Sequence, residues 1–386
     1  MSVIVAATRT PIGRAFKGSL AGLRPDDLAA HAVRAVLSQA EALDPGDVDD
    51  VILGAASGAG EQGMNLGRVA GQLAGLPPTV PGVTVNRFCA SSLQAIRMAH
   101  HAIAAGEGDV YVAAGVESVS RTAGRGWRDD DRHPRFVDHA HPDYVSDLYI
   151  PMGHTAENVA ADWSVPRERM DELALRSHLR AVAARDAGVH AREIVPVTLP
   201  DGTIVFQDDG PRPDTSLKRL AELKPAFREG GSVTAGNSCP LSDGAAAVLV
   251  MSEAKAEGLQ LTPMVRIVAS AVSGVEPEVM GVGPIEAVRR VLRAAGMTIG
   301  DVDVVELNEA FAAQVLPVCD ELGIDVDAQL NPHGGAIALG HPFGMTGARI
   351  MTALINDLRT LDGTIGLETM CVGGGQGMAM IVERMS

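Results

Sequence analysis

Two cysteines and a histidine stand at positions where this sequence could carry out covalent chemistry. The first, Cys89, follows a predicted strand at residues 83–86 and precedes a stretch of helical character that begins at Ala90. A thiol at the start of a helix lies near unpaired N–H groups and the positive end of the helix dipole, and both lower the thiol pKa. The position predicts a nucleophilic thiolate, although a free cysteine is also common as a buried core residue, and position alone leaves both interpretations open.

A glycine-rich segment at residues 334–347 surrounds His341 and Pro342. Glycines let the backbone approach other groups closely, and the proline stiffens the chain directly after the histidine. This pattern suits an imidazole held in one orientation as a general base. A structural histidine in a glycine-rich loop is the alternative.

A second cysteine, Cys371, ends a predicted strand at residues 366–370 and precedes three glycines that begin at Gly373. Ligands of α/β proteins bind at the carboxyl ends of strands, and glycine amides can donate hydrogen bonds to an oxyanion. Asn308 follows another predicted strand, at residues 300–307, where its amide could position a water or a carbonyl. Together with the first thiol and the histidine, these groups form a coherent candidate site.

An internal repeat predicts the elements that position these groups. Residues 32–37 and 287–292 are similar, and each segment is followed by a similar predicted strand, at 46–53 and 300–307. Two matches in the same order indicate a duplication, although two unrelated helix–strand units are the alternative. Alternating strands and helices predict α/β halves with helices on both faces of each sheet.

The expected fold class is α/β, a duplicated layered core with an inserted loop domain. We expect residues 1–117 to form the N-terminal core half and residues 246–386 to form the C-terminal core half. Residues 118–245 are the expected insert, which returns to the N-terminal half at its end. Because long loops inside a compact chain are usually functional, we expect this insert to lie over the core.

Composition excludes several classes of protein. The net charge is −16 without a basic stripe, which argues against nucleic-acid binding, although a local basic rim could still hold a phosphate. Four widely spaced cysteines predict reduced thiols. The sequence contains no signal peptide and no apolar run of about 18 residues, so we expect a cytoplasmic protein that does not interact with membranes.

Two further patterns are weak indications of a ligand site. Residues 58–63 fit the G-x-G-x-x-G pattern, but no acidic residue occurs between 64 and 106, where a dinucleotide-binding fold would need one. The segment at 138–143 contains two aspartates and two histidines, which could suggest a metal site. No further ligand set is evident, so we expect a solvated loop and no metal.

Taken together, these segments resemble the thiolase family over essentially the whole chain. The motifs that carry the resemblance occur in one order: ATRTPIG at 7–13, EQGMN at 61–65, NRFCASSLQ at 86–94, GVESVS at 115–120, MGHTAEN at 152–158, TAGN at 234–237, DGA at 243–245, NEAF at 308–311, GGAIALGHP at 334–342 and CVGGG at 371–375. The resemblance implies an αβαβα core and ping-pong acyl transfer between a 3-ketoacyl-CoA and coenzyme A. It also implies a homodimer or homotetramer, with coenzyme A as a substrate and no permanently bound cofactor.

The resemblance also implies catalytic roles. Cys89 would attack the 3-keto carbon and become acylated, and His341 would take its proton. His341, with a water held by Asn308, would stabilise the thioester enolate oxygen. Cys371 would protonate the departing carbanion, or remove the α-proton in the synthetic direction. The tetrahedral intermediate would lie on the backbone N–H groups of Cys89 and Gly373.

The positions that match the family's coenzyme A path form a second implied set: Met152, Arg212, Phe227, Cys239, Met280 and Phe311. Among them, Arg212 could pair with a phosphate. The sequence departs from the family's pattern where many members have a serine at Cys239, a histidine at Pro151 and an asparagine at His333. The first two departures touch the pantetheine region, and the third lies beside the catalytic loop, where it could tune His341 or fill space.

Three alternatives are retained. The phrase around Cys89 looks more like degradative 3-ketoacyl-CoA thiolases than like biosynthetic acetoacetyl-CoA thiolases. A ketoacyl synthase shares the fold but lacks a cysteine at the position of Cys371. A non-catalytic acyl-CoA or lipid carrier on the same fold would not need both of these cysteines together with His341.

Overall fold

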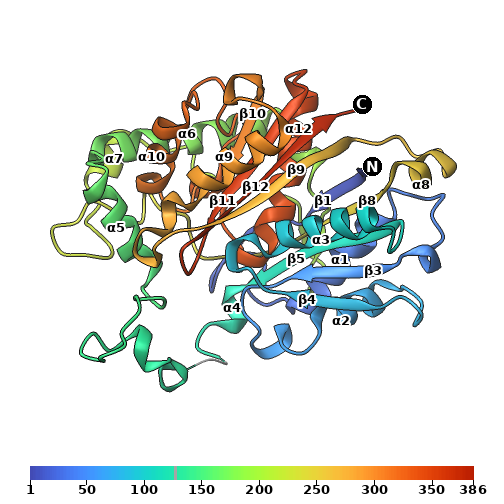
Figure 1. Cartoon of the computed structure of the whole chain (residues 1–386), viewed down its shortest axis with the longest axis horizontal. Helices are drawn as coiled ribbons and strands as arrows, with labels where there is room; N and C mark the ends of the chain where they lie inside the picture. The colour runs from blue at the N-terminus through green and yellow to red at the C-terminus, as the bar shows by residue number, and fades with distance from the viewer. Residues whose placement is uncertain (126–127) are drawn as a thin grey trace.

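Nine strands of the described residues form two half-sheets that meet at the first strand of each half. The computed structural model describes residues 1–125 and 128–386. The first half contains β1 (Ser2–Arg9), β3 (Asp50–Gly54), β4 (Gly82–Val85), β5 (Val110–Ser118) and β8 (Ser242–Ser252). The second contains β9 (Val265–Gly274), β10 (Val304–Leu307), β11 (Ile365–Val372) and β12 (Gln376–Arg384). Val3 and Ile4 of β1 pair with Arg266 and Val265 of β9, and this short antiparallel contact joins the halves (Figure 1).

Strand order repeats between the halves. The first half runs β4-β3-β5-β8-β1, and the second runs β10-β11-β12-β9, with a parallel bridge between Val305 and Leu330 in the place of β4. The pairs β3–β5 and β10–β11 are parallel, whereas β5–β8 and β11–β12 are antiparallel. The repeated order confirms the predicted duplicated α/β core.

Helices complete five layers. The outer face of the first half-sheet packs against α1 (Pro25–Leu37) and α2 (Leu66–Ala74), and that of the second against α9 (Gly283–Ala295) and α10 (Ala312–Leu322). Between the half-sheets lie α3 (Ser91–Ala105) and α12 (Thr346–Thr360), which share one apolar cluster with both inner faces. Every residue of α12 from Thr346 to Leu358 is buried, as a helix covered on all sides requires.

The two central helices approach each other closely at their N-terminal ends. A Cβ at Gly347 would lie 2.2 Å from the backbone N of Leu93, so only glycine fits there. Ser92 Oγ accepts a hydrogen bond of 2.9 Å from the N–H of Ala348. Close packing therefore brings the segments that precede α3 and α12 side by side.

The two repeated strands begin later than the sequence pattern predicted. In the first half, the 3₁₀ turn Pro45–Asp47 occupies the start of the expected strand, and Asp44 accepts from the N–H of Gly46. In the second half, the turn Ile299–Asp301 does the same, with a capping box between Thr298 and Asp301. Polar side chains that bond nearby backbone groups favour turns over strands, and this happens at equivalent places in both halves.

The inserted segment joins β5 to β8, where the second half has only the tight turn between β11 and β12. It contains α4 (Val119–Thr122), α5 (Met152–Asp162), α6 (Arg167–Asp186), α7 (Leu217–Ala221) and a small sheet of β6 (Val197–Thr198) with β7 (Ile204–Val205). Outside these elements the described part of the segment consists mostly of turns and loops. The expected boundary at residue 245 lies inside β8, which pairs with β1 and β5.

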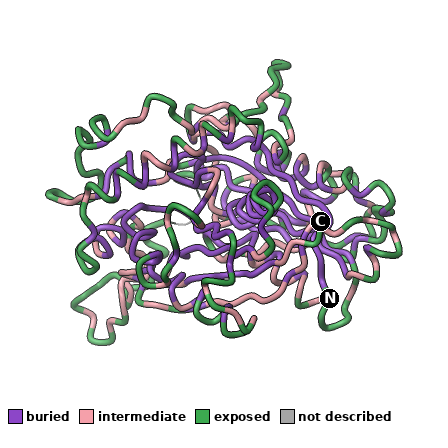
Figure 2. The backbone as a smooth tube through the Cα atoms, turned by 90° about the horizontal axis from the view of Figure 1, so that it is seen from above, coloured by how far each residue is buried: buried purple, intermediate pink, exposed green. Residues whose placement is uncertain are grey.

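Short elements complete the chain: β2 (Gly13–Arg14), α8 (Glu253–Gly258) and α11 (Ala336–Leu339). Burial is concentrated in the strands and the central helices, while the outer loops are exposed (Figure 2). No helix in the described parts of the chain is long and apolar enough to cross a membrane.

Candidate active site

Cys89 lies in a strained turn between β4 and α3. The turn is the 3₁₀ segment Phe88–Ala90, in which Phe88 has φ of 44°, a left-handed conformation that is uncommon outside glycine. Its backbone is fixed on both sides: Asn86 Oδ1 accepts from the N–H of Phe88 at 2.8 Å, and Ser91 Oγ donates to the carbonyl of Phe88 at 2.7 Å. The turn holds the thiol, which is 8% exposed, at the entrance to the central layer.

The expectation of a lowered pKa for the Cys89 thiol is wrong. Burial raises the pKa to about 11, and the nearby Glu117 carboxylate adds to the increase. Hydrogen bonds from the N–H groups of Gly373 and Cys89 itself favour the thiolate, but they do not offset the burial. The resting residue is therefore a thiol, and a reaction at its sulfur requires a base.

His341 is the candidate for that base. Its imidazole is 2% exposed, and burial together with Arg349 lowers its pKa to about 3, so the ring is neutral. The short turn Phe343–Met345 that follows it packs against the turn Phe88–Ala90, which also packs against β11. The ring of Phe343 meets the imidazole edge-on, with centroids 5.0 Å apart.

Hydrogen bonds define the tautomer of this imidazole. Thr346 Oγ1 donates to the carbonyl of Pro342 at 2.8 Å, so it can only accept from His341 Nδ1, which lies 2.6 Å away. The proton is therefore on Nδ1, and Nε2 carries the lone pair. Asn308 Nδ2 lies 3.3 Å from Nε2, on the side of the ring that can accept a proton.

Cys371 and Asn308 lie at the carboxyl ends of neighbouring parallel strands, as expected from sequence. The N–H of Asn308 donates to the carbonyl of Thr369 at 3.0 Å, and the Asn308 side-chain oxygen is buried without a hydrogen-bond partner. Burial raises the pKa of the Cys371 thiol well above its ordinary value, with smaller contributions from Cys89 and Cys239. These mutual effects place the three thiols close together, with Cys89 and Cys371 buried and Cys239 half-buried.

Most of the expected coenzyme A residues converge beside this cluster. Met152, Cys239, Met280 and Phe311 belong to one apolar cluster, and the rings of Phe227 and Phe311 meet edge-on with centroids 5.7 Å apart. A Cβ at Gly373 would lie 3.8 Å from Met152 Sδ and 3.6 Å from the ring of Phe88. The apolar set therefore reaches the glycine that faces the nucleophile.

Arg212 and two of the three departures from the family pattern lie in different surroundings. The side chain of Arg212 is near Arg14 and Asp214, and its backbone N–H donates to Nδ1 of His178. Pro151 caps the N-terminus of α5. His333 Nδ1 is 2.5 Å from Asp357 Oδ1, so this histidine pairs with α12 and not with His341.

Two supporting residues were not assigned a role from the sequence. Glu117, buried in β5, accepts hydrogen bonds from the N–H groups of Ala56, Ser57 and Gly344, and so links the first half to the loop of His341. An acid inside an apolar strand was the signal available. Gln314 of α10 accepts from Cys371 Sγ at 3.6 Å, and no sequence pattern marked it.

The glycine pattern at residues 58–63 has a structural role. In the segment 58–63, Glu61 pairs with Arg121, and Gln62 Nε2 donates to Glu117 at 2.7 Å. Within residues 1–125 and 128–386, no group of three or more histidine, cysteine or acidic side chains could hold a metal ion.

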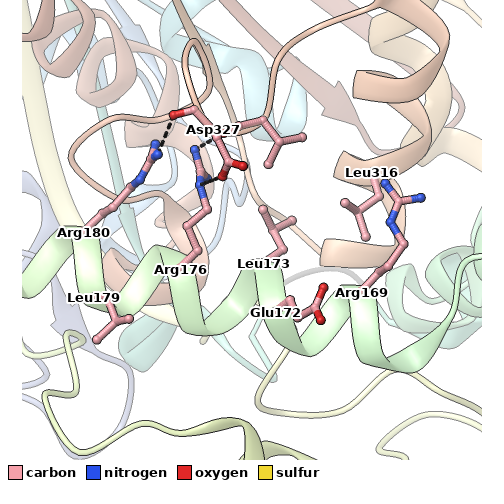
Figure 3. Close-up of a pocket in the computed structure, with 9 residues that line it drawn as sticks. Arg169, Glu172, Leu173, Arg176, Leu179, Arg180, Leu316 and Asp327 are labelled. Carbon is pink, nitrogen blue, oxygen red and sulfur yellow. Dashed lines mark hydrogen bonds and ion pairs between the residues drawn. The ribbon is translucent and has the colours of Figure 1, made fainter.

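A cavity of about 530 Å³ lies apart from the thiols, between α6, α10 and residues 326–327 (Figure 3). Arg180 donates to the carbonyls of Asp327 and Leu330 at 2.7 and 2.8 Å, and Arg176 also bonds the carbonyl of Leu330. These arginines anchor the segment that leads into Asn331 and the catalytic loop. Their bonds to backbone carbonyls give them a structural role.

Comparison with known proteins decides the family. A model of the thiolase N-terminal domain matches residues 2–254, and a model of the thiolase C-terminal domain matches residues 261–384. The chain belongs to the thiolase family. The two thiolase models meet between residues 254 and 261, beyond the end of β8.

Thiolases from several bacteria are similar over their full length. The chain is 45% identical to the 3-ketoacyl-CoA thiolase of Bacillus subtilis (strain 168), with 99% of each chain covered. It is 48% identical to the Beta-ketoadipyl-CoA thiolase of Escherichia coli, with 98% of each covered. The crystal structure of the Bacillus anthracis acetyl-CoA acetyltransferase matches with a TM-score of 0.90 and 39% identity, covering 100% of this chain and 98% of that one. This thiolase-family chain is therefore an acyltransferase with the predicted fold, and thiolases use coenzyme A as a substrate.

Proposed function

We propose that the chain cleaves 3-ketoacyl-CoA with coenzyme A, giving acetyl-CoA and a shortened acyl-CoA. The observation that carries this proposal is the orientation of His341. Its neutral ring has the proton on Nδ1, bonded to Thr346, and so directs a basic Nε2 towards Asn308. The buried thiol of Cys89 needs such a base, because its pKa is about 11.

The first half-reaction begins when His341 takes the proton of Cys89 and the sulfur attacks the 3-keto carbon. The N–H groups of Gly373 and Cys89, which already bond this sulfur, are placed to donate to the oxyanion of the tetrahedral intermediate. Cleavage of the bond between C2 and C3 leaves its electron pair on C2 of acetyl-CoA. The Cys371 thiol protonates that carbon, and the acyl group stays on Cys89.

The second half-reaction releases the acyl group. His341 takes the thiol proton of coenzyme A, whose sulfur attacks the thioester on Cys89, and the same two N–H groups donate to the second oxyanion. The bond between the acyl carbon and Cys89 then breaks, and His341 returns the proton to the Cys89 sulfur. In the first half-reaction, the thioester oxygen of acetyl-CoA carries the enolate charge while the bond between C2 and C3 breaks. A water held by the unpaired side-chain oxygen of Asn308, together with His341 Nε2, is our proposal for the partner of that charge.

The coenzyme A path would run over the apolar set at Met152, Phe227 and Met280, with Phe311 and Cys239 beside it, and Arg212 would face a phosphate at its outer end. Two relatives carry names that point to degradation, a 3-ketoacyl-CoA thiolase and a Beta-ketoadipyl-CoA thiolase. We therefore favour degradation of a 3-ketoacyl-CoA over synthesis of acetoacetyl-CoA. We also propose that the chain acts in the cytoplasm.

We also propose that the chain forms a homodimer or homotetramer. β4 ends the strand order and has one neighbour, β3, within the described chain, and an open edge strand can pair with another copy. Phe88, next to the nucleophile, is 48% exposed and would be covered by such a partner. Light scattering coupled to size-exclusion chromatography measures the mass, and a monomer at micromolar concentration would contradict this assembly.

The decisive test replaces the nucleophile. Cys89→Ala is expected to abolish thiolysis of 3-ketoacyl-CoA and the exchange of labelled coenzyme A into acetyl-CoA. The circular dichroism spectrum and the melting temperature should stay near those of the wild type, because the change removes one sulfur atom at the edge of the core. Thiolysis by this variant at the wild-type rate would overturn the mechanism.

Substrate class is tested separately. Thiolysis is measured with straight-chain 3-ketoacyl-CoA esters of increasing length and with 3-oxoadipyl-CoA, which ends in a carboxylate. A higher kcat/KM for longer or dicarboxylic substrates than for acetoacetyl-CoA supports the degradative proposal. A clear preference for acetoacetyl-CoA supports the biosynthetic alternative.

A further inference from the structure

A directional chain of hydrogen bonds lies behind Cys371. It runs from the thiol to Gln314 of α10, from Gln314 to Thr155 of α5, and from Thr155 to the carbonyl of Met152. We propose that Gln314, oriented by Thr155, is a positioning residue that holds Cys371 as a proton donor in the cleavage reaction. This inference rests on the proposed thiolysis reaction.

The direction of the chain follows from counting protons. The single hydroxyl proton of Thr155 goes to the carbonyl of Met152 at 2.7 Å, so Thr155 Oγ1 can only accept from Gln314 Nε2, 3.3 Å away. The nitrogen of the amide thus faces Thr155, and its oxygen faces Cys371 Sγ at 3.6 Å. A carbonyl oxygen has no proton to give, so the thiol of Cys371 must be the donor.

Burial makes this arrangement rigid and strong. Gln314 is 2% exposed, Thr155 is 0% and Cys371 is 3%, so water does not compete for these bonds. A Cβ at Gly281 would lie 2.2 Å from Gln314 Cγ, so the neighbouring backbone closes on the side chain. The amide therefore has little freedom to turn its nitrogen towards the thiol.

The consequence for catalysis is an acid kept in its protonated form. A bond from S–H to a carbonyl oxygen stabilises the thiol and not the thiolate, which adds to the effect of burial on Cys371. When the bond between C2 and C3 of the substrate breaks, its electron pair takes the proton of Cys371 and becomes the new C–H bond of acetyl-CoA. Cys371 is then a thiolate that faces the oxygen of Gln314.

All protons are accounted for within the first half-reaction. The proton that His341 took from Cys89 passes to the Cys371 thiolate, so both groups return to their resting states. The net change transfers the acyl group to Cys89 and one hydrogen to acetyl-CoA. In the synthetic direction the same steps run in reverse: Cys371 passes its proton to His341 and then removes the α-proton of acetyl-CoA.

The test separates two half-reactions. Exchange of labelled coenzyme A into acetyl-CoA needs Cys89 and His341, whereas thiolysis and deuterium incorporation into the acetyl methyl group also need Cys371. We expect Gln314→Met, which keeps the volume but removes the acceptor, to slow thiolysis and deuterium incorporation about tenfold or more. The rate of coenzyme A exchange should change less than about threefold, because the contact that is removed belongs to Cys371 and not to Cys89 or His341.

A pH profile gives a second readout that a merely structural residue would not move. The acceptor stabilises the protonated thiol, so its removal lowers the pKa of Cys371. The alkaline limb of kcat for thiolysis, where the acid is lost, should therefore move to lower pH in Gln314→Met.

Thr155 supplies a matched pair of variants. Thr155→Val removes the hydroxyl that orients the amide and should reproduce the selective loss, whereas Thr155→Ser keeps the hydroxyl and should restore thiolysis. Equal losses in thiolysis and coenzyme A exchange, or no loss in either, would overturn the role of Gln314. Absence of coenzyme A exchange in the wild-type protein would instead overturn the proposed function itself.

Discussion

At the scale of single residues, burial decides which protonation states are available. The thiol of Cys89 has its pKa raised to about 11 and the imidazole of His341 has its pKa lowered to about 3. Both shifts have the same main cause, because a buried group loses the hydration of its charged form. The resting pair is therefore neutral.

Alkylation of Cys89 tests this neutral state. Below its pKa the thiolate fraction rises about tenfold per pH unit, so the rate of inactivation by iodoacetamide should rise about tenfold per unit between about pH 7 and 9. Mass spectrometry assigns the modified cysteine. A rate that is constant over this range would show a thiolate already formed at neutral pH, and would restore the original expectation of a lowered pKa.

The tautomer of His341 provides a second residue-scale prediction. Thr346→Val removes the acceptor of the Nδ1 proton, so the imidazole can place its proton on Nε2, where it no longer accepts from Cys89. We expect kcat for coenzyme A exchange to fall about 10- to 100-fold, the usual cost of losing an orienting partner. Thr346→Ser keeps the hydroxyl and is the matched control; comparable losses in both variants would contradict the tautomer.

At the scale of elements, one buried asparagine sets the end of β10. Asn331 Oδ1 accepts from the N–H of Leu307 at 2.9 Å, and Nδ2 donates to the carbonyl of Leu307 at 2.9 Å and to Glu309 Oε1 at 2.8 Å. Its φ of 40° is one that asparagine tolerates better than most residues. The position of Asn308, the next residue of the chain, depends on this contact.

Asn331→Ala should therefore affect both stability and catalysis. The variant leaves the buried N–H and carbonyl of Leu307 unpaired, and each unpaired group costs about 1–3 kcal/mol. Urea unfolding monitored by circular dichroism should show a lower free energy of unfolding, and kcat for thiolysis should fall as Asn308 loses its position. Asn331→Gly relieves the backbone strain without restoring the bonds, so a full recovery of stability by glycine would contradict this account.

At the scale of the whole molecule, two adjacent strands in the core of the second half each carry a buried acid. Glu306 of β10 and Glu368 of β11 are paired in the parallel register, and Arg349 and Asp357 of α12 lie near them. Both side-chain oxygens of Glu368 are buried without a partner, and burial raises its pKa well above the ordinary value, partly opposed by Arg349. Glu306 has its pKa raised by burial and by Asp357, with which it shares a hydrogen bond.

The sign of the pH dependence follows from linkage. In the unfolded chain Glu368 loses its proton near pH 4, whereas in the folded chain it keeps the proton to higher pH. Stability from this group is complete at low pH and is lost as the pH rises towards the folded pKa. Glu368→Gln mimics the neutral acid, so its free energy of unfolding relative to wild type should increase from pH 5 to pH 8. The free energies of unfolding of both proteins are measured in urea at each pH. A difference between them that stays constant from pH 5 to pH 8 would contradict the prediction.

The sequence by itself was sufficient for the kinds of reactive group, their order and the duplicated fold. Glycine spacing, strand ends and the repeat are local patterns, and local patterns persist in any chain that folds as an alternating α/β protein. They brought Cys89, His341, Cys371 and Asn308 into one candidate site before any contact was known. They misplaced the starts of β3 and β10, because capped turns compete with strands at a level that apolar patterning does not record.

Only the tertiary structure decided the protonation states and the partners of these groups. The pKa of Cys89 depends on how completely other elements remove water from it, and helix position alone predicted the wrong direction. Gln314 and Thr155 lie 159 residues apart, and their bond exists because α5 and α10 pack together. Contacts between residues far apart in the sequence, and the exclusion of water, arise only when the layers pack together. The sequence therefore predicted Cys89 as the nucleophile but not the protonation state of its thiol.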